Sequence, residues 1–409
     1  MTAPACRLCG AELTHTFVDL GMSPPCESYL AADQLDRGET FYPLHVRICA
    51  ECLLVQLPAY LSGEDIFSHY AYFSSYSDSW VEHARRFVDA AVDRLGLGAD
   101  SFVIEVASND GYLLQHSIAR GLRSLGIEPA ANVAEAAIEK GIPTEVEFLG
   151  EKTGTRIAAA HGRADLVVAN NVFAHVPDIV DFAKGLAALV TPDGAVTIEV
   201  PHLLRLIEGR EYDTIYHEHF SYLSLLTTQR VLKRAGLKVI DVEELPTHGG
   251  SLRTWSVPVA SGQPVTPAVA AVLAAEAAAG LDTLDGHSGF AATVAGVRND
   301  FVGFLIECAE KGATVAGYGA PGKGNTLLNH CGIRSDLLAF TVDRNPFKHG
   351  KFLPGTHIPI HPVEKLAEAA PDYVVILPWN LREEIAAQLH YVREWGGQLV
   401  VPLPSLEIF

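Results

Sequence analysis

One short run of the chain concentrates groups that can transfer protons or bind a metal. It consists of Tyr216, His217, Glu218 and His219, and it follows a strand-like apolar stretch at 195–200. Histidine titrates near neutral pH, so it serves equally well as a general base or as a metal ligand. The run lacks the i, i+4 histidine pair of an H-E-x-x-H zinc site. The residues themselves leave both kinds of chemistry open.

A second cluster is made of cysteines. Cys6, Cys9, Cys49 and Cys52 form two C-x-x-C pairs, a spacing that lets both thiolates of a pair reach one tetrahedral zinc ion. The gap between the pairs is longer than in compact zinc ribbons. A redox-active pair is the alternative, but neither pair lies in a thioredoxin-like βαβ pattern. We therefore predict a structural zinc with four thiolate ligands, which favours proton transfer over a catalytic metal at the histidine run.

The composition limits the classes of partner. The chain has 409 residues, 30 basic and 49 acidic, for a formal charge of −19, which disfavours nonspecific binding to nucleic acid or to an anionic membrane. Seven cysteines, an odd number, argue against a disulfide framework. No signal-like start or membrane-length apolar run is present, so we expect a cytoplasmic protein that acts without a membrane or nucleic acid, and we favour a monomer.

The middle of the chain alternates strand-like and helix-like segments. Strands are expected at 102–106, 126–128, 165–169 and 196–200, after a helix at 80–95. This rhythm predicts an α/β fold with a parallel-rich sheet and helices on both faces, the Rossmann-like arrangement.

The pattern suggests three parts: a zinc-binding module at 1–75, a central cofactor-binding domain at 76–260, and a third part at 261–409. The third part begins with alanine-rich helix, continues with a helix at about 288–311, and ends in a second Rossmann-like unit. Its strands are expected at 313–317, 338–342 and 373–377.

The first loop of the central block has the composition of a nucleoside-binding loop. Its polar and small residues follow the first strand, and Glu128 follows the second strand, where a carboxylate can accept hydrogen bonds from ribose hydroxyls. The loop lacks the G-x-G-x-x-G that brings backbone close to a pyrophosphate, so we predict a cofactor without one. The residues assigned to this site are Glu105, Ser108, Asn109, Asp110, Gly111, Glu128 and Asn170.

Asn170 and its neighbour Asn171 end the third strand of the block, where they could approach a substrate or simply cap the following turn. His175 lies five residues after Asn170, and it could face a reaction centre or be a structural histidine.

The last block carries a formal G-x-G-x-x-G at 317–322, directly after a strand. It also approaches a P-loop through Lys323, but Gly324 stands where the Mg²⁺-binding hydroxyl should be. We favour a nucleotide-diphosphate site here over a solvated loop, with Trp379 either stacking on a base or closing the core. The residues assigned to this site are Lys323, Asn325, Arg344, Lys348 and Trp379.

Four motifs together resemble a known family. They are EVASNDG at 105–111, NNVFAHV at 170–176, YHEHFSY at 216–222 and GYGAPGKG at 317–324. Nearly the whole chain is similar to the S-adenosylmethionine-dependent C-methyltransferases of nucleotide-linked 4-keto-deoxysugars, and most similar to those that methylate C-3 of dTDP-sugars. The resemblance implies S-adenosyl-L-methionine as cofactor beside the structural zinc, a dTDP-linked 4-keto-deoxysugar as substrate, and a role in deoxysugar or antibiotic biosynthesis.

The resemblance also implies roles for residues. Methylation next to a ketone needs a base to form an enolate and donors to stabilise its oxygen. We assign the base to His219, with Glu218 orienting it or its neighbours, Tyr216 or Tyr70 donating to the sugar or enolate, and His175 also contributing. Tyr76, Asn171 and Tyr222 are assigned to substrate binding.

Two other functions compete with this one. An oxidoreductase would use NAD(P) on the 317–322 loop with Asp343 on the ribose, and a noncatalytic zinc-containing scaffold would leave the histidine run without a role.

Overall fold

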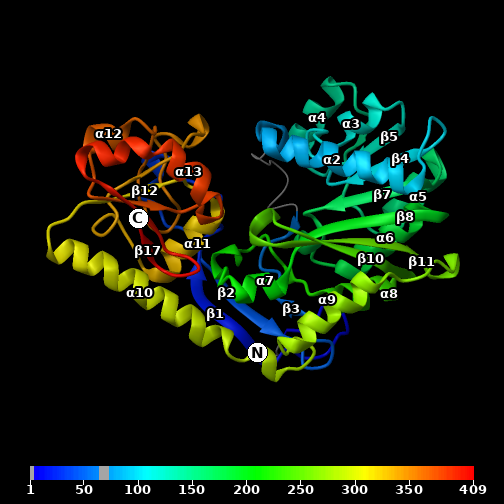
Figure 1. Ribbon diagram of the computed structural model, residues 1–409, viewed down its shortest axis with the longest axis horizontal. Helices are drawn as coiled ribbons and strands as arrows, with labels where there is room; N and C mark the ends of the chain where they lie inside the picture. The colour runs from blue at the N-terminus through cyan, green and yellow to red at the C-terminus, as the bar shows by residue number, and fades with distance from the viewer. Residues whose placement is uncertain (1–3, 64–72) are drawn as a thin grey trace. The chain divides into compact units, whose positions relative to one another are not determined.

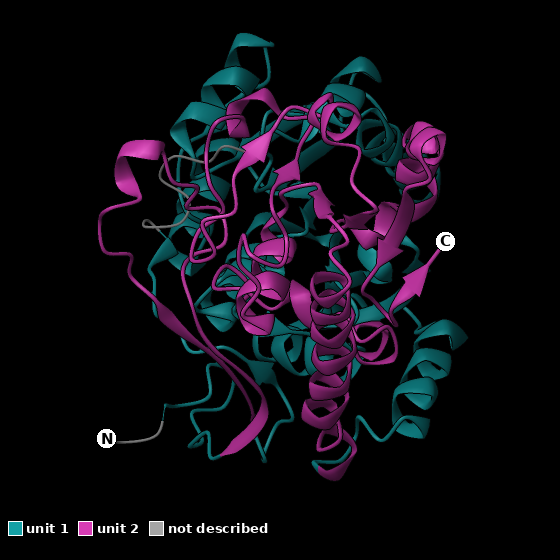
Figure 2. Ribbon diagram, turned by 90° about the vertical axis from the view of Figure 1, so that its left-hand side faces the viewer, with its two compact units in different colours: residues 1–14, 49–203, 220–284 teal, residues 15–48, 204–219, 285–409 magenta. Residues whose placement is uncertain are grey.

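The computed structural model describes residues 4–63 and 73–409 (Figure 1). Contacts divide the chain into two compact units, each assembled from separate stretches of sequence (Figure 2). Unit 1 consists of Met1–Thr14, Cys49–Leu203 and Phe220–Leu284, and unit 2 consists of His15–Ile48, Leu204–His219 and Asp285–Phe409. Within the described ranges, no helix combines the length and the apolar character needed to cross a membrane.

Unit 1 is built on a seven-stranded sheet in the order β10-β11-β8-β7-β4-β5-β6. The strands are β4 (Phe102–Val106), β5 (Arg123–Ile127), β6 (Thr144–Glu145), β7 (Ala164–Asn170), β8 (Val190–Pro201), β10 (Leu237–Leu245) and β11 (Ser251–Pro258). Pairing is parallel from β6 to β8, and β11 runs antiparallel to both of its neighbours. The predicted parallel-rich α/β fold is therefore confirmed.

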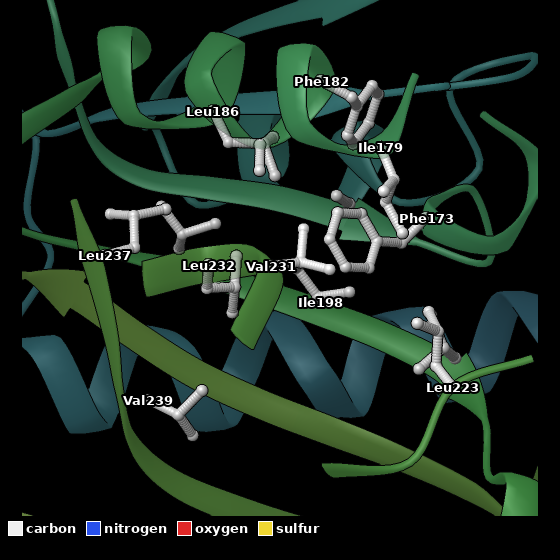
Figure 3. Close-up of a cluster of buried hydrophobic side chains, with 14 of the residues drawn as sticks. Phe173, Ile179, Phe182, Leu186, Ile198, Leu223, Val231, Leu232, Leu237 and Val239 are labelled. Carbon is white, nitrogen blue, oxygen red and sulfur yellow. The ribbon is translucent and has the colours of Figure 1, made fainter. Parts of the chain in front are cut away.

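The central strands are apolar on both faces because helices cover both. Ile104 of β4 belongs to one buried cluster, while its neighbour Val103 belongs to another on the opposite face. Figure 3 shows part of the first cluster, where Ile198 of β8 lies among Val231 and Leu232 of α8 (Leu225–Arg234). Helices α5 (Glu151–His161) and α6 (Ile179–Leu189) contribute to the first cluster; α2 (Asp78–Leu95), α3 (Leu114–Ala119) and α4 (Ala131–Glu139) contribute to the second.

Helix α2 confirms the helix predicted at 80–95 and shows why it begins and ends there. The Ser77 hydroxyl accepts a hydrogen bond from the amide of Trp80, which satisfies one of the unpaired donors of the first turn. Gly96 closes the helix in the left-handed conformation, with φ of 63°.

Other elements of unit 1 include two short strands, two 3₁₀ turns and a helix. Strand β3 (Val55–Gln56) follows the second pair and runs antiparallel to β9 (Ser221–Tyr222). The 3₁₀ turns η2 (Ser74–Tyr76) and η3 (Phe173–His175) precede α2 and follow β7, and α9 (Pro267–Ala278) comes after β11.

Unit 2 contains a six-stranded sheet in the order β14-β13-β12-β15-β16-β17. The strands are β12 (Val315–Tyr318), β13 (Thr341–Val342), β14 (Ile360–His361), β15 (Tyr373–Ile376), β16 (Gln398–Val401) and β17 (Glu407–Ile408), and only the β16–β17 pair is antiparallel. The strand expected at 338–342 is shorter than predicted, because the amide of Leu338 bonds back to the carbonyl of Arg334 in a turn.

Other parts of unit 2 come from early and central sequence. Its helices are α7 (Leu203–Glu208, from residue 204), α10 (Phe290–Glu310), α11 (Gly322–Cys331), α12 (Lys365–Ala369) and α13 (Arg382–Gln388). Strands β1 (His15–Ser23) and β2 (Tyr42–Ile48) pair antiparallel, and the turn η4 (Tyr212–Thr214) leads directly into the histidine run.

Candidate active site

The four N-terminal cysteines converge as the spacing predicted. Their sulfur atoms all lie within 4.8 Å of one another, with Cys6 3.5 Å from Cys52 and Cys9 3.4 Å from Cys49. A tetrahedral zinc with Zn–S bonds of about 2.3 Å needs sulfur atoms about 3.8 Å apart. Each pair is closed by a backbone hydrogen bond of 2.9 Å to the carbonyl of its first cysteine. These thiolates therefore fit a zinc ion with no rearrangement of the chain.

The loop after β4 has a strained backbone that its surroundings hold in place. Ala107 and Asn109 have φ values of 56° and 51°, in the left-handed region that costs a non-glycine residue about 1–3 kcal/mol. The amide of Ala107 donates to the carbonyl of Ile127 at 2.7 Å, and that of Asn109 donates to Glu128 Oε2 at 2.9 Å. Glu128 also accepts from the amide of Ala130 at 2.9 Å, so this carboxylate fixes the loop.

Several polar atoms at the ends of neighbouring strands have no hydrogen-bond partner in the part of the chain that the structure describes. Ser108 Oγ, Asn170 Oδ1 and both polar atoms of Asn171 are buried, with no hydrogen bond to any described residue. Leaving a buried polar group unpaired costs about 1–3 kcal/mol. These atoms follow β4 and β7, which are adjacent parallel strands, and the carboxyl ends of such strands are where open α/β sheets bind ligands. We infer that these groups await a ligand.

The charge of this region suits a cationic ligand. Burial, followed by repulsion from Glu128 and Asp110, raises the pKa of Glu105 well above its usual value. Burial also raises the pKa of Glu128, against the effect of its two backbone donors. A pyrophosphate would add to the negative charge, whereas a sulfonium ion would relieve it. The residues present therefore fit S-adenosyl-L-methionine.

Two residues assigned to the cofactor use their side chains to hold the turn η2. Asn109 Oδ1 accepts from the amide of Ser74 at 2.8 Å, and Asp110 accepts from the amide of Ser75 at 3.3 Å and from its hydroxyl. Lys140 donates to Asp110 Oδ2 at 2.9 Å. Tyr76, at the end of this turn, is 76% exposed. Tyr70 lies outside the described residues.

The two imidazoles of the histidine run have different partners. In unit 2, His217 Nε2 donates to the carbonyl of Tyr42 at 3.3 Å, while His219 Nδ1 donates to the carbonyl of Thr214 at 2.6 Å. A carbonyl can only accept, so Nδ1 of His219 carries the hydrogen and Nε2 is the basic nitrogen of the neutral ring. The Tyr216 ring centre lies 3.9 Å from that of His219.

Glu218 is a carboxyl group that holds its proton. Burial, and secondly repulsion from Glu27, raises the pKa of Glu218 to about 8. Its Oε1 lies 3.9 Å from the Sγ of Cys26. At neutral pH the side chain is therefore mostly the neutral acid, which can donate a hydrogen bond.

Several groups in and beside the glycine-rich loop of unit 2 are hydrogen-bonded to neighbours in the same unit. The amide of Ala320 donates to Asp343 Oδ2 at 2.7 Å, and the other oxygen of Asp343 accepts from the amide of Asn345 at 2.8 Å. Lys348 Nζ donates to the carbonyl of Ala320 at 2.8 Å. Asn325 Nδ2 donates to the carbonyl of Cys26 at 2.6 Å, and Arg344 is exposed.

Lys323, the lysine next to that loop, is surrounded by groups of its own unit. It donates to Asn380 and lies 4.4 Å from the ring centre of Trp379. Burial lowers the pKa of Lys323, while the charges of Asp213 and Glu211 act against that shift. Trp379 Nε1 donates to Asp213 Oδ2 at 2.7 Å. Trp379 is thus hydrogen-bonded to the buried Asp213, whose charge also acts on Lys323.

The other predicted substrate and catalytic residues fall in unit 1. His175 ends the turn η3, where its amide donates to the carbonyl of Val172 at 2.8 Å. Tyr222 lies in β9 and is 4% exposed.

Comparison with known proteins identifies the family. The chain is 38% identical over 400 residues to the C-methyltransferase NovU of Streptomyces niveus, an alignment that covers 98% of this chain and 95% of that protein. The chain belongs to this C-methyltransferase family. Family models match a zinc binding domain at residues 6–67, a methyltransferase domain at 80–242 and a C-methyltransferase C-terminal domain at 246–404.

Other similarities are shorter. The ubiquinone biosynthesis O-methyltransferase of Methylobacterium sp. (strain 4-46) is 30% identical over 168 residues, covering 38% of this chain and 66% of that protein. An S-adenosylmethionine-dependent methyltransferase structure from Clostridium acetobutylicum ATCC 824 shows 9% identity and a TM-score of 0.36, covering 43% of this chain and 91% of that one. As a member of its family, this C-methyltransferase uses S-adenosyl-L-methionine and has a zinc-binding module.

Sequence patterns did not single out some residues that the site depends on. Thr214 sets the hydrogen position on His219 through its backbone carbonyl, which carries no side-chain signal. Lys140 binds Asp110 from 30 residues away, and only the fold brings them together. The alternation of strands and helices was the available signal, because it brings the chain after each helix back to the sheet, and Lys140 directly follows α4.

Proposed function

We propose that this enzyme transfers a methyl group to C-3 of a dTDP-linked 4-keto-deoxysugar, as a step in deoxysugar or antibiotic biosynthesis. The observation that carries the proposal is the state of His219, whose Nδ1 is committed to the Thr214 carbonyl at 2.6 Å. The basic Nε2 belongs to a ring fixed in one orientation. A proton acceptor held in this way is what removal of a proton next to a ketone requires.

In the proposed reaction His219 Nε2 takes the C-3 proton, whose acidity comes from the neighbouring 4-keto group. The resulting electron pair forms the enolate and then the new carbon–carbon bond. S-adenosyl-L-methionine, when bound, supplies an electrophilic methyl group. Tyr216, whose ring lies 3.9 Å from that of His219, would donate its phenolic hydrogen bond to the sugar or the enolate oxygen.

Glu218 is proposed as a second donor to the developing oxyanion. Its pKa, raised to about 8, keeps the proton on the carboxyl group at neutral pH. A neutral acid stabilises an enolate oxygen, whereas a carboxylate would repel it. This role complements that of the Thr214 carbonyl, which already orients His219.

For the nucleotide part of the substrate, the proposal uses the basic residues that follow β13. Arg344 is exposed, and Lys348 lies over the ring of Tyr29 at 4.9 Å. Lys323 has carboxylate neighbours, so its charge is less available to a diphosphate. Asn171, whose side-chain polar atoms bond no described residue, is the proposed sugar contact in unit 1, with Tyr76 and Tyr222 as further candidates. His175 is proposed to contribute to catalysis.

The test is an incubation of dTDP-4-keto-deoxysugars, with either an amino or a hydroxyl group at C-3, with methyl-labelled S-adenosylmethionine. Mass spectrometry should show one labelled methyl group in a product, and NMR should place it at C-3. In deuterated water with S-adenosylhomocysteine, the enzyme should also exchange the C-3 hydrogen of the substrate, and His219→Ala should not. Methylation at oxygen, or at another carbon, would contradict the proposal.

A further inference from the structure

Arg7 lies inside the first cysteine pair and extends away from it. Its Nη1 donates to the carbonyl of Pro177 at 3.0 Å, and its Nη2 donates to the carbonyl of Leu57. The guanidinium also lies 5.4 Å from the ring centre of Phe220. A guanidinium keeps its charge in proteins, so Arg7 is a cation at neutral pH. One cation thus contacts three separate segments of unit 1.

The backbone of Arg7 is joined to the zinc ligands. Its amide donates to Gln56 Oε1 at 2.9 Å, and Gln56 Nε2 donates to the Sγ of Cys6 at 3.1 Å. Hydrogen bonds to ligand atoms hold a metal site in its orientation. Gln56 also pairs with Ser221 in the β3–β9 ladder. The position of Arg7 is therefore fixed by the same groups that fix the thiolates.

The segments at the other end of Arg7 lead to two of the proposed site residues. Pro177 is two positions after His175, and Phe220 directly follows His219. The amide of Phe220 donates to the carbonyl of Ala174 at 2.9 Å, so the two segments are also bonded to each other. The two hydrogen bonds of the guanidinium go to the carbonyls of Pro177 and Leu57, and the amide of Leu57 donates to the carbonyl of Phe220 at 3.0 Å. The planar fork of Arg7 therefore sets the distance and the angle between the Pro177 and Leu57 carbonyls, and it reaches Phe220 through Leu57.

We propose that Arg7 is a positioning residue for methyl transfer, which ties the zinc-binding pair to the backbone segments that carry His175 and His219. The inference rests on the proposed roles of those two histidines. It gives the zinc module a function in catalysis that acts through placement and not through contact with the substrate. Small displacements of reacting groups have large effects on rate, so the tie matters even though Arg7 touches no reacting atom.

The experiment compares Arg7→Met, which keeps an apolar stem, with Arg7→Lys, which keeps the charge but not the two-pronged geometry. The matched control is Arg230→Met. Arg230 Nη1 donates to the carbonyl of Cys52 at 2.6 Å, so this arginine supports the second cysteine pair, and within the described part of the chain it makes no hydrogen bond to Pro177, Leu57 or Phe220. We expect Arg7→Met to lower kcat by about tenfold to a hundredfold, with the KM for S-adenosylmethionine within about twofold. Arg7→Lys should be intermediate, and Arg230→Met should keep its kcat.

Zinc content and amide hydrogen exchange supply readouts that do not depend on turnover. Both Arg7 variants should keep about one zinc per chain, a number that follows from one four-thiolate site. Exchange should become faster at the amides of His175 and Phe220 but not at that of Leu53, which is bonded within the second cysteine pair. Loss of zinc in both variants, or unchanged exchange, would overturn the inference. If the native enzyme methylates none of the sugars, the proposed function fails, and the exchange measurement still decides whether the tie exists.

Discussion

Two loops of this chain follow a parallel strand and precede a helix. They differ in how many of their polar groups are already hydrogen-bonded within the protein. The loop after β4 in unit 1 has no G-x-G-x-x-G, and it leaves Ser108 and the nearby Asn170 with unpaired polar atoms among the residues described. The loop after β12 in unit 2 has the full glycine pattern, but Asp343 and Lys348 already bind its backbone. Asn325 Oδ1, beside the second loop, is also buried without a partner among the described residues, so the contrast concerns the backbone of the two loops and not every side chain near them.

The comparison teaches that a glycine motif reports how closely backbone can approach, and not whether its donors are available. In unit 1 the strained backbone is held by Glu128, and the cost of strain and unpaired groups is consistent with a function. In unit 2 the carboxylate predicted for a ribose bonds the loop itself. The difference lies in the partners, which the motif does not specify.

The largest expected effect is on kcat, and it tests whether unit 2 contributes the proposed base. His219→Ala should lower kcat by about a thousandfold, within the usual 10²–10⁴ contribution of a general base. Binding of S-adenosylhomocysteine, measured by calorimetry, should stay within about twofold of the native value, because the cofactor groups of unit 1 are unchanged. A fall in kcat of less than tenfold would remove His219 from the role of base.

The second prediction compares a buried amide beside each loop. Asn170→Ala removes an Oδ1 that bonds no described residue, so we expect the melting temperature to change little and the Kd for S-adenosylhomocysteine to rise about tenfold to a hundredfold. Asn325→Ala breaks the 2.6 Å bond to the Cys26 carbonyl, so it should cost about 1–3 kcal/mol of stability and leave that Kd unchanged.

Calorimetry and thermal melting on both asparagine variants measure these opposite outcomes. NADH should neither bind the native protein nor shift its melting temperature. Tight NADH binding that Asp343→Asn abolishes would show that the second loop is also a ligand site, and the contrast between the loops would then be wrong.

A third prediction concerns pH. The pKa of Glu218 is raised to about 8, so the side chain is mostly protonated below pH 8 and mostly ionised above it. If the neutral acid donates to the enolate, kcat should fall on the alkaline side and reach about one tenth of its plateau one unit above that pKa. Glu218→Gln, which keeps an N–H donor but cannot ionise, should lack this fall. An alkaline limb that persists in Glu218→Gln must come from another group.

The smallest expected effect is on cofactor binding, and it concerns the lysine that pairs with Asp110 in the loop after β4. Lys140→Met removes the 2.9 Å ion pair with Asp110, but the lysine side chain is 44% exposed, so solvent screens most of that interaction. We expect the Kd for S-adenosylhomocysteine to rise by about threefold or less. Ser75→Ala serves as the companion variant, because Ser75 binds the same carboxylate without a charge. A large effect of Lys140→Met alone would indicate that its charge acts on the ligand directly.

Much of the fold followed from local pattern. Helix α2 and the strands β4 and β7 were predicted within a few residues, because each has its own local pattern of apolar residues. The division of the chain into units did not follow: residues 15–48 and 204–219 belong to unit 2, although the sequence around them reads as continuous with unit 1. Long-range packing decides such membership, and periodicity describes only one element at a time.

The candidate site shows the same limit. The carboxylate at Glu128 and the histidine run were singled out from residue type and position, because few residues are able to do that chemistry, and their roles stay predictions. The hydrogen position on His219 depends on the carbonyl of Thr214, and the environment of Lys323 depends on Asp213, more than a hundred residues earlier. Backbone partners and buried charges of this kind leave no mark in local sequence.

The sequence by itself determined the zinc ligands and the kind of cofactor, since two C-x-x-C pairs and an acidic loop without a diphosphate motif restrict the chemistry wherever the chain places them. Tertiary structure alone decided that Asp343 already binds the glycine loop of unit 2, which nitrogen of His219 is basic, and that Arg7 joins the cysteine pair to Pro177. The reason is physical: the identity of a group sets what it can do, and its hydrogen-bond partners and burial set what it is free to do.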